Sequence, residues 1–187
     1  YLSKFSRLLR LVLEHSDLAV VSLQAELEVL NLYISLEALR FKDDMVVRFI
    51  VEEQVDPEEI RIPSMLIQPH LENAIWHGLR HKEGEKRLTV SIAEKIPGYL
   101  EVNILDNGIG RSKAALLKKD RLGQHKHESK GNKLSGNRLE ILRLLHPSTS
   151  IMIEDLMDNA GNSLGTLVRL SIPILDKKTG ISKSNAV

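Results

Sequence analysis

Cysteine is absent from the 187 residues, so neither a disulfide nor a thiolate metal site is available. There is also no apolar run long enough to span a bilayer and no signal peptide, and we expect any membrane anchor to lie outside this chain. The net charge is only +1, which argues against a dedicated nucleic-acid or membrane-surface protein. Neither a G-x-x-x-x-G-K-[ST] phosphate loop nor the motifs of serine, threonine and tyrosine kinases occur.

The length and the 42% hydrophobic content suit one domain with a helical appendage. The chain begins in helix-like sequence, so we expect it to be part of a longer protein. Apolar spacing predicts an amphipathic helix from Tyr1 to about Asp17, and a second from its N-cap Ser22 to about Phe41. The second helix has two apolar seams. It is therefore packed either between its own domain and a partner helix, perhaps of another subunit, or within a single core.

Beyond the second helix, apolar and polar residues alternate in five short stretches, a pattern typical of half-buried strands. The dipeptide Pro97-Gly98 predicts a hairpin turn between two of them. Helical periodicity returns after Ser64, where Pro69 implies either a kink or a later start of the helix. The predicted strands are 45–51, 87–93, 99–106, 150–156 and 166–172, and further helices are predicted at 111–120 and 131–145.

The most informative stretch is the helix at 69–78, P-H-L-E-N-A-I-W-H-G. At 100° per residue its apolar side chains fall on one side, and Glu72, Asn73, Trp76 and His77 fall on the other. A plain surface helix would carry Lys and Glu there, so this face is either a binding site or a half-buried helix with a few polar residues. We expect Trp76 to cover part of such a site, the alternative being packing against the preceding helices.

A second group of polar residues ends two predicted strands on their inward side. Asp106 has the parity of the apolar residues of its strand, and an inward carboxylate is costly unless it receives hydrogen bonds. Gly108 and Gly110 follow it and allow a tight backbone and close approach of a ligand. An ordinary Asn-Gly turn would explain these glycines but not the inward carboxylate. Thr166, beside Gly165, brings a hydroxyl to the inward side of the last strand.

These polar groups together predict a pocket between a sheet and a helical layer. Its acidic end suits an amino group, its amide and carboxylate pair suits hydrated Mg²⁺, and backbone and hydroxyl donors suit phosphates. Gly131 precedes a predicted helix, whose free N–H groups and dipole could hold an anion. The pattern indicates a nucleotide site without a Walker loop.

The order of these motifs resembles the GHKL superfamily of ATP-binding proteins, with an N-box at 71–78, D-x-G-x-G at 106–110, a glycine-containing loop at Gly131 and the Gly-Thr pair 165–166. The chain resembles LytS-like sensor histidine kinases most closely, because P-x-x-x-x-Q-P-x-x-E-N-A-x-x-H-G is matched over 63–78. The second helix is also similar to that family's pattern L-x-x-E-L-x-x-x-x-x-Y-x-x-L-E-x-x-R-F over 23–41, notably at Leu27, Tyr33, Glu37, Arg40 and Phe41. The resemblance covers roughly residues 1–175.

The resemblance implies a Bergerat-type α/β sandwich with a mixed, mostly antiparallel sheet, preceded by a helical hairpin segment. Residues 1–41 would be the C-terminal part of the dimerisation helices, 42–175 the ATP-binding catalytic domain, and 176–187 a disordered polar tail. The whole protein would transfer the ATP γ-phosphoryl to an upstream histidine and then to a response regulator. It would be a homodimer through its N-terminal helices, cytoplasmic in this part, membrane-anchored outside it, and without a nucleic-acid partner.

The resemblance also implies roles for single residues. Asn73 would bind Mg²⁺, Glu72 would be the general base, and His77 would flank the phosphates. Asp106 would accept a hydrogen bond from the adenine amino group, with Thr166 hydrogen-bonded around it. The remaining nucleotide-binding positions would be Gly108 and Gly110, where the backbone passes close to the nucleotide, Gly131, which opens the phosphate loop, and Lys133, which would contact phosphate.

Two departures from the family pattern leave other functions open. Lys133 stands where the phosphate loop usually has a second glycine, and the P-H-F-x-x-N motif of the phospho-accepting histidine is absent. We expect His15 to be a surface residue rather than the acceptor, so this chain alone would not phosphorylate itself. The alternatives are a conformational GHKL ATPase in which Glu72 activates water, and a non-catalytic helical scaffold with a decayed pocket.

Overall fold

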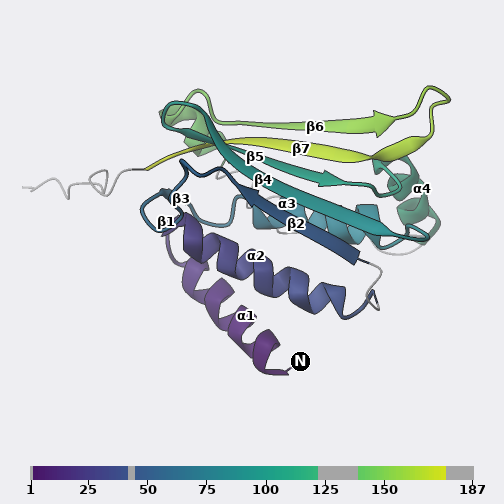
Figure 1. Cartoon of the computed structure of the whole chain (residues 1–187), viewed down its shortest axis with the longest axis horizontal. Coiled ribbons are helices and arrows are strands. Elements are labelled where there is room, and N and C mark those ends of the chain that lie inside the picture. Colours follow the sequence, from purple (N-terminus) through teal and green to yellow (C-terminus); the bar gives the residue numbers. More distant parts are fainter. Residues whose placement is uncertain (1, 42–44, 122–138, 176–187) are drawn as a thin grey trace, which may run out of the picture.

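A computed structural model describes residues 2–41, 45–121 and 139–175. A sheet forms one layer and helices cover one of its faces (Figure 1). The predicted tail at 176–187 lies outside the described residues. The elements are α1 (Leu2–Ser16), β1 (Val20–Ser22), α2 (Leu23–Ala38), β2 (Met45–Val51), β3 (Arg61–Pro63), α3 (Gln68–Asn73), the π-helical η1 (Ala74–Leu79), β4 (Lys86–Ile96), β5 (Tyr99–Asp106), α4 (Arg111–Arg121), a helix at 139–145, β6 (Ser150–Met157) and β7 (Ser163–Pro173).

The main sheet has five strands in the order β2-β4-β5-β7-β6. β2 and β4 run parallel, and every other neighbouring pair is antiparallel. The prediction of an α/β fold with a mixed, mostly antiparallel sheet is therefore confirmed. β1 and β3 form a separate antiparallel pair that was not predicted, because three residues are too few to show an alternating pattern.

The core lies between the sheet and a layer formed by α2, α3 and η1. Residues four apart share one side of a helix, and this spacing carries the apolar stripe that leads into α3 and continues through η1. The opposing strands β4 and β5 alternate, so every second side chain points into the same core. The fully buried residues of the stripe are Ile67, Leu71, Ile75 and Leu79, and those facing them include Leu88, Val90, Leu100 and Ile104.

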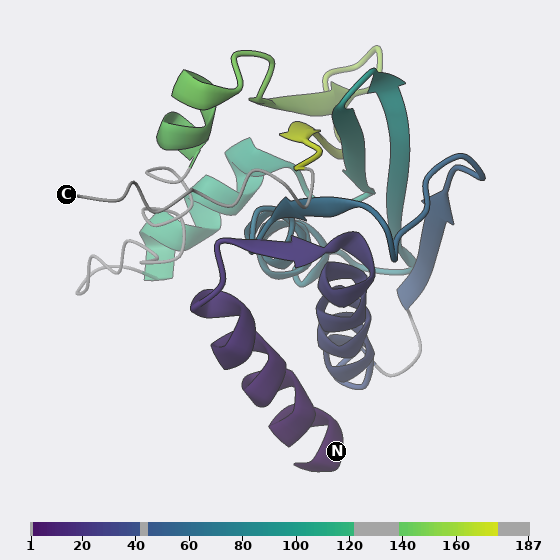
Figure 2. The ribbon, with the colours of Figure 1, turned by 90° about the vertical axis from the view of Figure 1, so that its left-hand side faces the viewer.

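α2 is buried on two sides, as its two seams predict. Ser22 caps it, since its Oγ accepts a hydrogen bond from the N–H of Ala25 at 3.2 Å. The inner seam joins the main core, whereas Val29 and Leu36 of the outer seam pack on Leu8 of α1. Figure 2 shows α1 against α2 on the side away from the sheet. The predicted domain boundary between residues 41 and 42 stays a prediction. The inner side of α2 belongs to the same hydrophobic core as the sheet.

The helix of the N-box begins late rather than kinking. α3 starts at Gln68 with Pro69 in its first turn, where the missing N–H of proline costs nothing. The helix then widens into η1, and the N–H of Arg80 bonds the carbonyl of Ile75 at 2.9 Å. This π-helical widening was not predicted, because no sequence signal distinguishes it from a regular turn.

The end of α1 contradicts one prediction. His15 is buried, not exposed, because the chain reverses there into β1 with the N–H of Leu18 bonded to the carbonyl of His15. Earlier in α1, the apolar side chains of Leu2, Phe5, Leu9 and Leu13 are exposed. In the described part of the chain, none of the helices has the length and apolar character needed to cross a bilayer.

Candidate functional site

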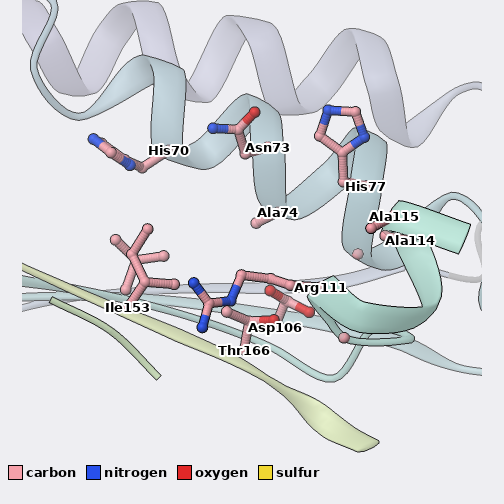
Figure 3. A pocket seen from close by; sticks show the side chains of 13 residues that line it. His70, Asn73, Ala74, His77, Asp106, Arg111, Ala114, Ala115, Ile153 and Thr166 are labelled. Atoms are coloured by element: carbon pink, nitrogen blue, oxygen red, sulfur yellow. The ribbon is translucent and has the colours of Figure 1, made fainter. Parts of the chain in front are cut away.

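A cavity of about 300 Å³ lies between the N-box helix and the sheet. In Figure 3, Asn73 and His77 project from the helix, Asp106 and Thr166 lie on the sheet, and Arg111 stands at the start of α4. The cavity thus unites five predicted site residues from separate parts of the sequence: Asn73, His77, Asp106, Gly110 and Thr166. Its other lining residues are His70, Ala74, Gly78, Arg111, Ala114, Ala115, Ile153 and Val168.

Asp106 is the most buried charged group of the cavity, with 2% of its surface exposed. It pairs with Thr166 across β5 and β7, and its Oδ1 accepts a hydrogen bond from the N–H of Gly108 at 2.7 Å. Burial raises the pKa of Asp106 to about 6, although backbone N–H groups of Gly108 and Thr166 oppose the rise. At neutral pH the carboxyl is therefore still mainly ionised and offers acceptor oxygens.

Glycines let three segments of backbone close around Asp106. A Cβ on Gly108 would lie 2.4 Å from the carbonyl carbon of Gly78, and a Cβ on Gly78 would lie 2.7 Å from Asp106 Oδ1. At Gly165, where φ is +134°, a Cβ would lie 1.8 Å from the carbonyl oxygen of Asp106. Packing alone therefore explains why glycine is needed at positions 78, 108 and 165. The close approach of a ligand to Gly108 and Gly110 stays a prediction.

The helix side of the cavity carries nitrogen and amide groups. His70, Asn73 and His77 follow one another along the helix in Figure 3. His70 was not predicted as a site residue, although it stands three residues before Asn73 and so on the same side. Burial lowers the pKa of His70, which keeps its imidazole neutral at pH 7.

An ion pair at the cavity edge was also missed. Arg111 Nη2 lies 2.9 Å from Asp155 Oδ2, and Nε lies within hydrogen-bond distance of both carboxylate oxygens. The pair ties the start of α4 to β6, and the hydrogen bond from Arg111 lowers the pKa of Asp155. Asp155 stands opposite Thr166 in the sheet register. Only the pairing of β6 with β7 brings it to the site, so the sequence alone does not reveal it.

Two predicted site residues that the structure describes, Gly108 and Glu72, do not line the cavity. The N–H of Gly108 donates to Asp106 Oδ1, and Glu72 Oε1 accepts a hydrogen bond from Gln68 Nε2 at 2.8 Å. The role of Glu72 as a general base therefore stays a prediction. Gly131 and Lys133 of the expected phosphate loop lie outside the described residues.

The expected placement of Trp76 over the site is wrong. Its Nε1 donates a hydrogen bond to the hydroxyl of Tyr33 at 2.8 Å, so the alternative of packing against a preceding helix holds. The guanidinium groups of Arg40 and Arg80 lie 5.5 and 4.6 Å from the ring centre. Three residues along a helix leave Trp76 roughly 60° from Asn73. The hydrogen bond with Tyr33 of α2 holds the indole on the α2 side of the helix.

The donor set fits a nucleotide better than a free metal ion. Among the residues that the structure describes, no three His, Cys, Asp or Glu side chains gather to hold a metal by themselves. Mg²⁺ keeps several waters and commonly binds through few protein groups together with substrate phosphates. Asn73 at one side of the cavity and the buried Asp106 at another fit a metal-bound phosphate and a base with an amino group.

Comparison with known proteins supplies an independent observation. The family model described as histidine kinase matches residues 1–45. Sensor histidine kinase YpdA of Escherichia coli (strain K12) is 30% identical over 141 residues, which cover 75% of this chain and 22% of that protein. Sensor protein LytS of Oceanobacillus iheyensis is 27% identical over 174 residues, covering 92% and 28%. The chain thus spans less than a third of the length of either relative.

Solved structures of histidine kinases share the fold. The histidine kinase domain of the Erythrobacter litoralis EL346 blue-light activated histidine kinase aligns with a TM-score of 0.53 and 14% identity, covering 92% of this chain and 74% of that one. The mycobacterial sensor histidine kinase MprB aligns with a TM-score of 0.51 and 18% identity, covering 84% and 97%. At these identities the likeness concerns the fold alone.

Proposed function

Because this chain belongs with the LytS-like sensor histidine kinases, we propose that it is the ATP-binding catalytic module of such an enzyme. The whole protein would transfer the γ-phosphoryl of ATP to a histidine upstream of this chain and then to the aspartate of a response regulator. The observation that carries the proposal is the buried carboxylate of Asp106 at the cavity. Burying a carboxylate is unfavourable, and such groups gather at functional sites where a ligand donates to them.

The proposed nucleotide lies across the cavity from sheet to helix. Asp106 accepts a hydrogen bond from the adenine amino group, and Thr166 beside it lines the same end. Asn73 holds Mg²⁺ through its amide oxygen, and His77 flanks the phosphates. Gly131 and Lys133 complete the phosphate loop in this proposal.

The chemistry rests on position and charge. Bound Mg²⁺ supplies charge neutralisation at the phosphates, as is general in phosphoryl transfer. The chain orients the base through Asp106 and holds the metal end through Asn73. Glu72, the proposed general base, has its carboxylate bonded to Gln68 in this arrangement, so a water or a side-chain rotation would have to connect it to the reacting groups.

The surroundings of α1 support the proposed homodimer. α1 exposes an apolar stripe at helical spacing, consisting of Leu2, Phe5, Leu9 and Leu13. Exposed apolar surface of this kind marks an interaction site, and a second copy of α1 would cover it. The proposed protein is anchored in the membrane by segments outside this chain, with this part in the cytoplasm.

Calorimetry with ATP, with and without Mg²⁺, tests the proposal. Wild-type protein should bind ATP more tightly with Mg²⁺. Asn73→Ala should lose this dependence and retain Mg²⁺-free binding, because the adenine end is intact. Asn103→Ala is the matched control, since Asn103 bonds Glu101 and Arg169 away from the cavity. Full Mg²⁺ dependence in Asn73→Ala would remove Asn73 as the ligand.

Labelled ATP separates the kinase from its alternatives. With an upstream histidine segment supplied in trans, a kinase module should produce acid-labile, base-stable phosphate on that segment. Release of inorganic phosphate without labelling would instead indicate the conformational ATPase. Absence of ATP binding would indicate a scaffold with a decayed pocket.

A further inference from the structure

Three residues recur along α2 and its end at intervals of seven: Glu26, Tyr33 and Arg40. Seven residues are close to two helical turns, so the three form one stripe. Each of them contacts the N-box helix or the residues that lead into it. The proposed function gives none of them a role.

Glu26 lies at the start of the N-box helix. It is only 1% exposed, and its Oε2 accepts a hydrogen bond from the N–H of Met65 at 3.3 Å. Burial raises the pKa of Glu26, and the N–H groups of Met65, Ile67 and Gln68 oppose the rise. α3 has no side-chain cap of its own at Ile67. A carboxylate from α2 therefore occupies the position that a capping residue fills elsewhere.

Tyr33 and Arg40 contact the same helix beyond Asn73. The hydroxyl of Tyr33 accepts the hydrogen bond from Trp76, and the guanidinium of Arg40 lies over the indole ring. Trp76 follows Asn73 by three residues, whereas the contact with Glu26 precedes Asn73 by about two turns. The two contacts therefore bracket Asn73, and neither rotation nor sliding of the helix would preserve both.

We infer that Glu26 and Tyr33 are positioning residues of the nucleotide site, which hold Asn73 at the spacing from Asp106 that one bound MgATP requires. The inference rests on the proposed function and goes beyond it, because neither residue lines the cavity. Their effect is selective. Loosening the helix displaces Asn73 from the metal, while Asp106, held by β5 and β7, keeps its place at the adenine end.

Tyr33→Phe in the full chain is the first test, because it removes one hydroxyl and leaves the ring. MgATP should bind about two- to tenfold more weakly by calorimetry, as expected for one lost hydrogen bond, whereas ATP with EDTA should bind as to wild type. Emission of Trp76, the only tryptophan, should shift as Nε1 loses its partner. Tyr99→Phe, on β5, is the matched control and should change none of these readouts.

Glu26→Gln is the second test. A neutral amide oxygen accepts the hydrogen bond from the N–H of Met65 more weakly than the carboxylate oxygen does, so MgATP binding should again weaken selectively. Glu28→Gln is the matched control, since Glu28 is on the same helix but pairs with Arg7. Melting temperatures of all four variants show whether each protein is folded at the temperature of the titration.

The outcomes separate this inference from the proposed function. Wild-type affinity for MgATP in both Tyr33→Phe and Glu26→Gln would overturn the inference and leave the proposed function standing. Equal weakening with Mg²⁺ and with EDTA would also overturn it, because that result reports general loosening. Failure of the wild-type protein to bind ATP at all would overturn the proposed function and the inference with it.

Discussion

The helix at 68–79 has two polar sides that differ in what they contact. Toward α2, Trp76 bonds Tyr33, and the guanidinium groups of Arg40 and Arg80 lie close to its ring. Toward the sheet, Asn73 lines a cavity whose opposite wall holds a buried carboxylate. Side chains that bind one another fix where a helix lies, whereas side chains around a cavity are placed for something that enters it. The side toward α2 therefore explains where the helix lies, and the side toward the sheet supplies residues for ligand binding.

The largest effect should come from forcing apart the two backbone segments that meet at Gly78 and Gly108. Gly108→Ala places a Cβ 2.4 Å from the backbone of Gly78 on η1, which neither segment can accommodate. We expect the free energy of unfolding to fall by about 3 kcal/mol or more in chemical denaturation. Gly84→Ala, with φ +72° and no atom within 4 Å, should cost only about 1 kcal/mol. Equal losses in the two variants would contradict this packing.

The next effect concerns the charge that the cavity buries. The pKa of Asp106 is about 6 in the folded protein against 3.8 ordinarily, so ionisation weakens the fold. The contribution of Asp106 to stability is fully present below pH 3.8 and is lost as pH rises through about 6. Asp106→Asn should therefore be more stable than wild type at pH 7, by up to about 3 kcal/mol, with the difference shrinking toward pH 4.

Denaturation of both proteins between pH 4 and 8 checks this. Asp158→Asn is a control of opposite sign, because hydrogen bonds from Asn162 lower the pKa of Asp158. Its carboxylate contributes stability above the ordinary pKa, and that contribution is lost as pH falls through the folded value. A pH-independent difference for Asp106→Asn would show that its carboxyl is not desolvated.

Much of this arrangement follows from residue patterns. Alternation predicts the strands and the hairpin, and parity alone places Asp106 and Thr166 on the inward side, where the structure pairs them. The two-sided burial of α2 follows from its seams. These features are local, since each depends on the spacing of residues within one element.

The errors have a different origin. Trp76 and Asn73 share a polar half of an idealised helix, but tertiary contacts with Tyr33 decide which way the indole turns. His15 is buried by a chain reversal, not by its own helix. The ion pair of Arg111 with Asp155 depends on which strands are neighbours. Patterns within one element carry no information about such contacts between elements.

The smallest effect should come from that ion pair at the cavity edge. The Arg111 side chain is 54% exposed, so the coupling energy with Asp155 in a double-mutant cycle should stay below about 1 kcal/mol. Salt should reduce it further, because exposed charges are screened. A coupling of several kcal/mol that salt leaves unchanged would show that the pair is a buried anchor of α4.

The central claim is that Asp106 recognises the adenine base by accepting a hydrogen bond from its amino group. The most direct test is to titrate the wild-type protein and Asp106→Asn with ATP and with GTP. Guanine presents a carbonyl oxygen where adenine has its amino group, so the carboxylate should favour ATP. Asp106→Asn should weaken ATP by about 1.5–3 kcal/mol, the value of a hydrogen bond to a charged group, and should not weaken GTP. Unchanged ATP affinity in a folded Asp106→Asn protein would contradict the account.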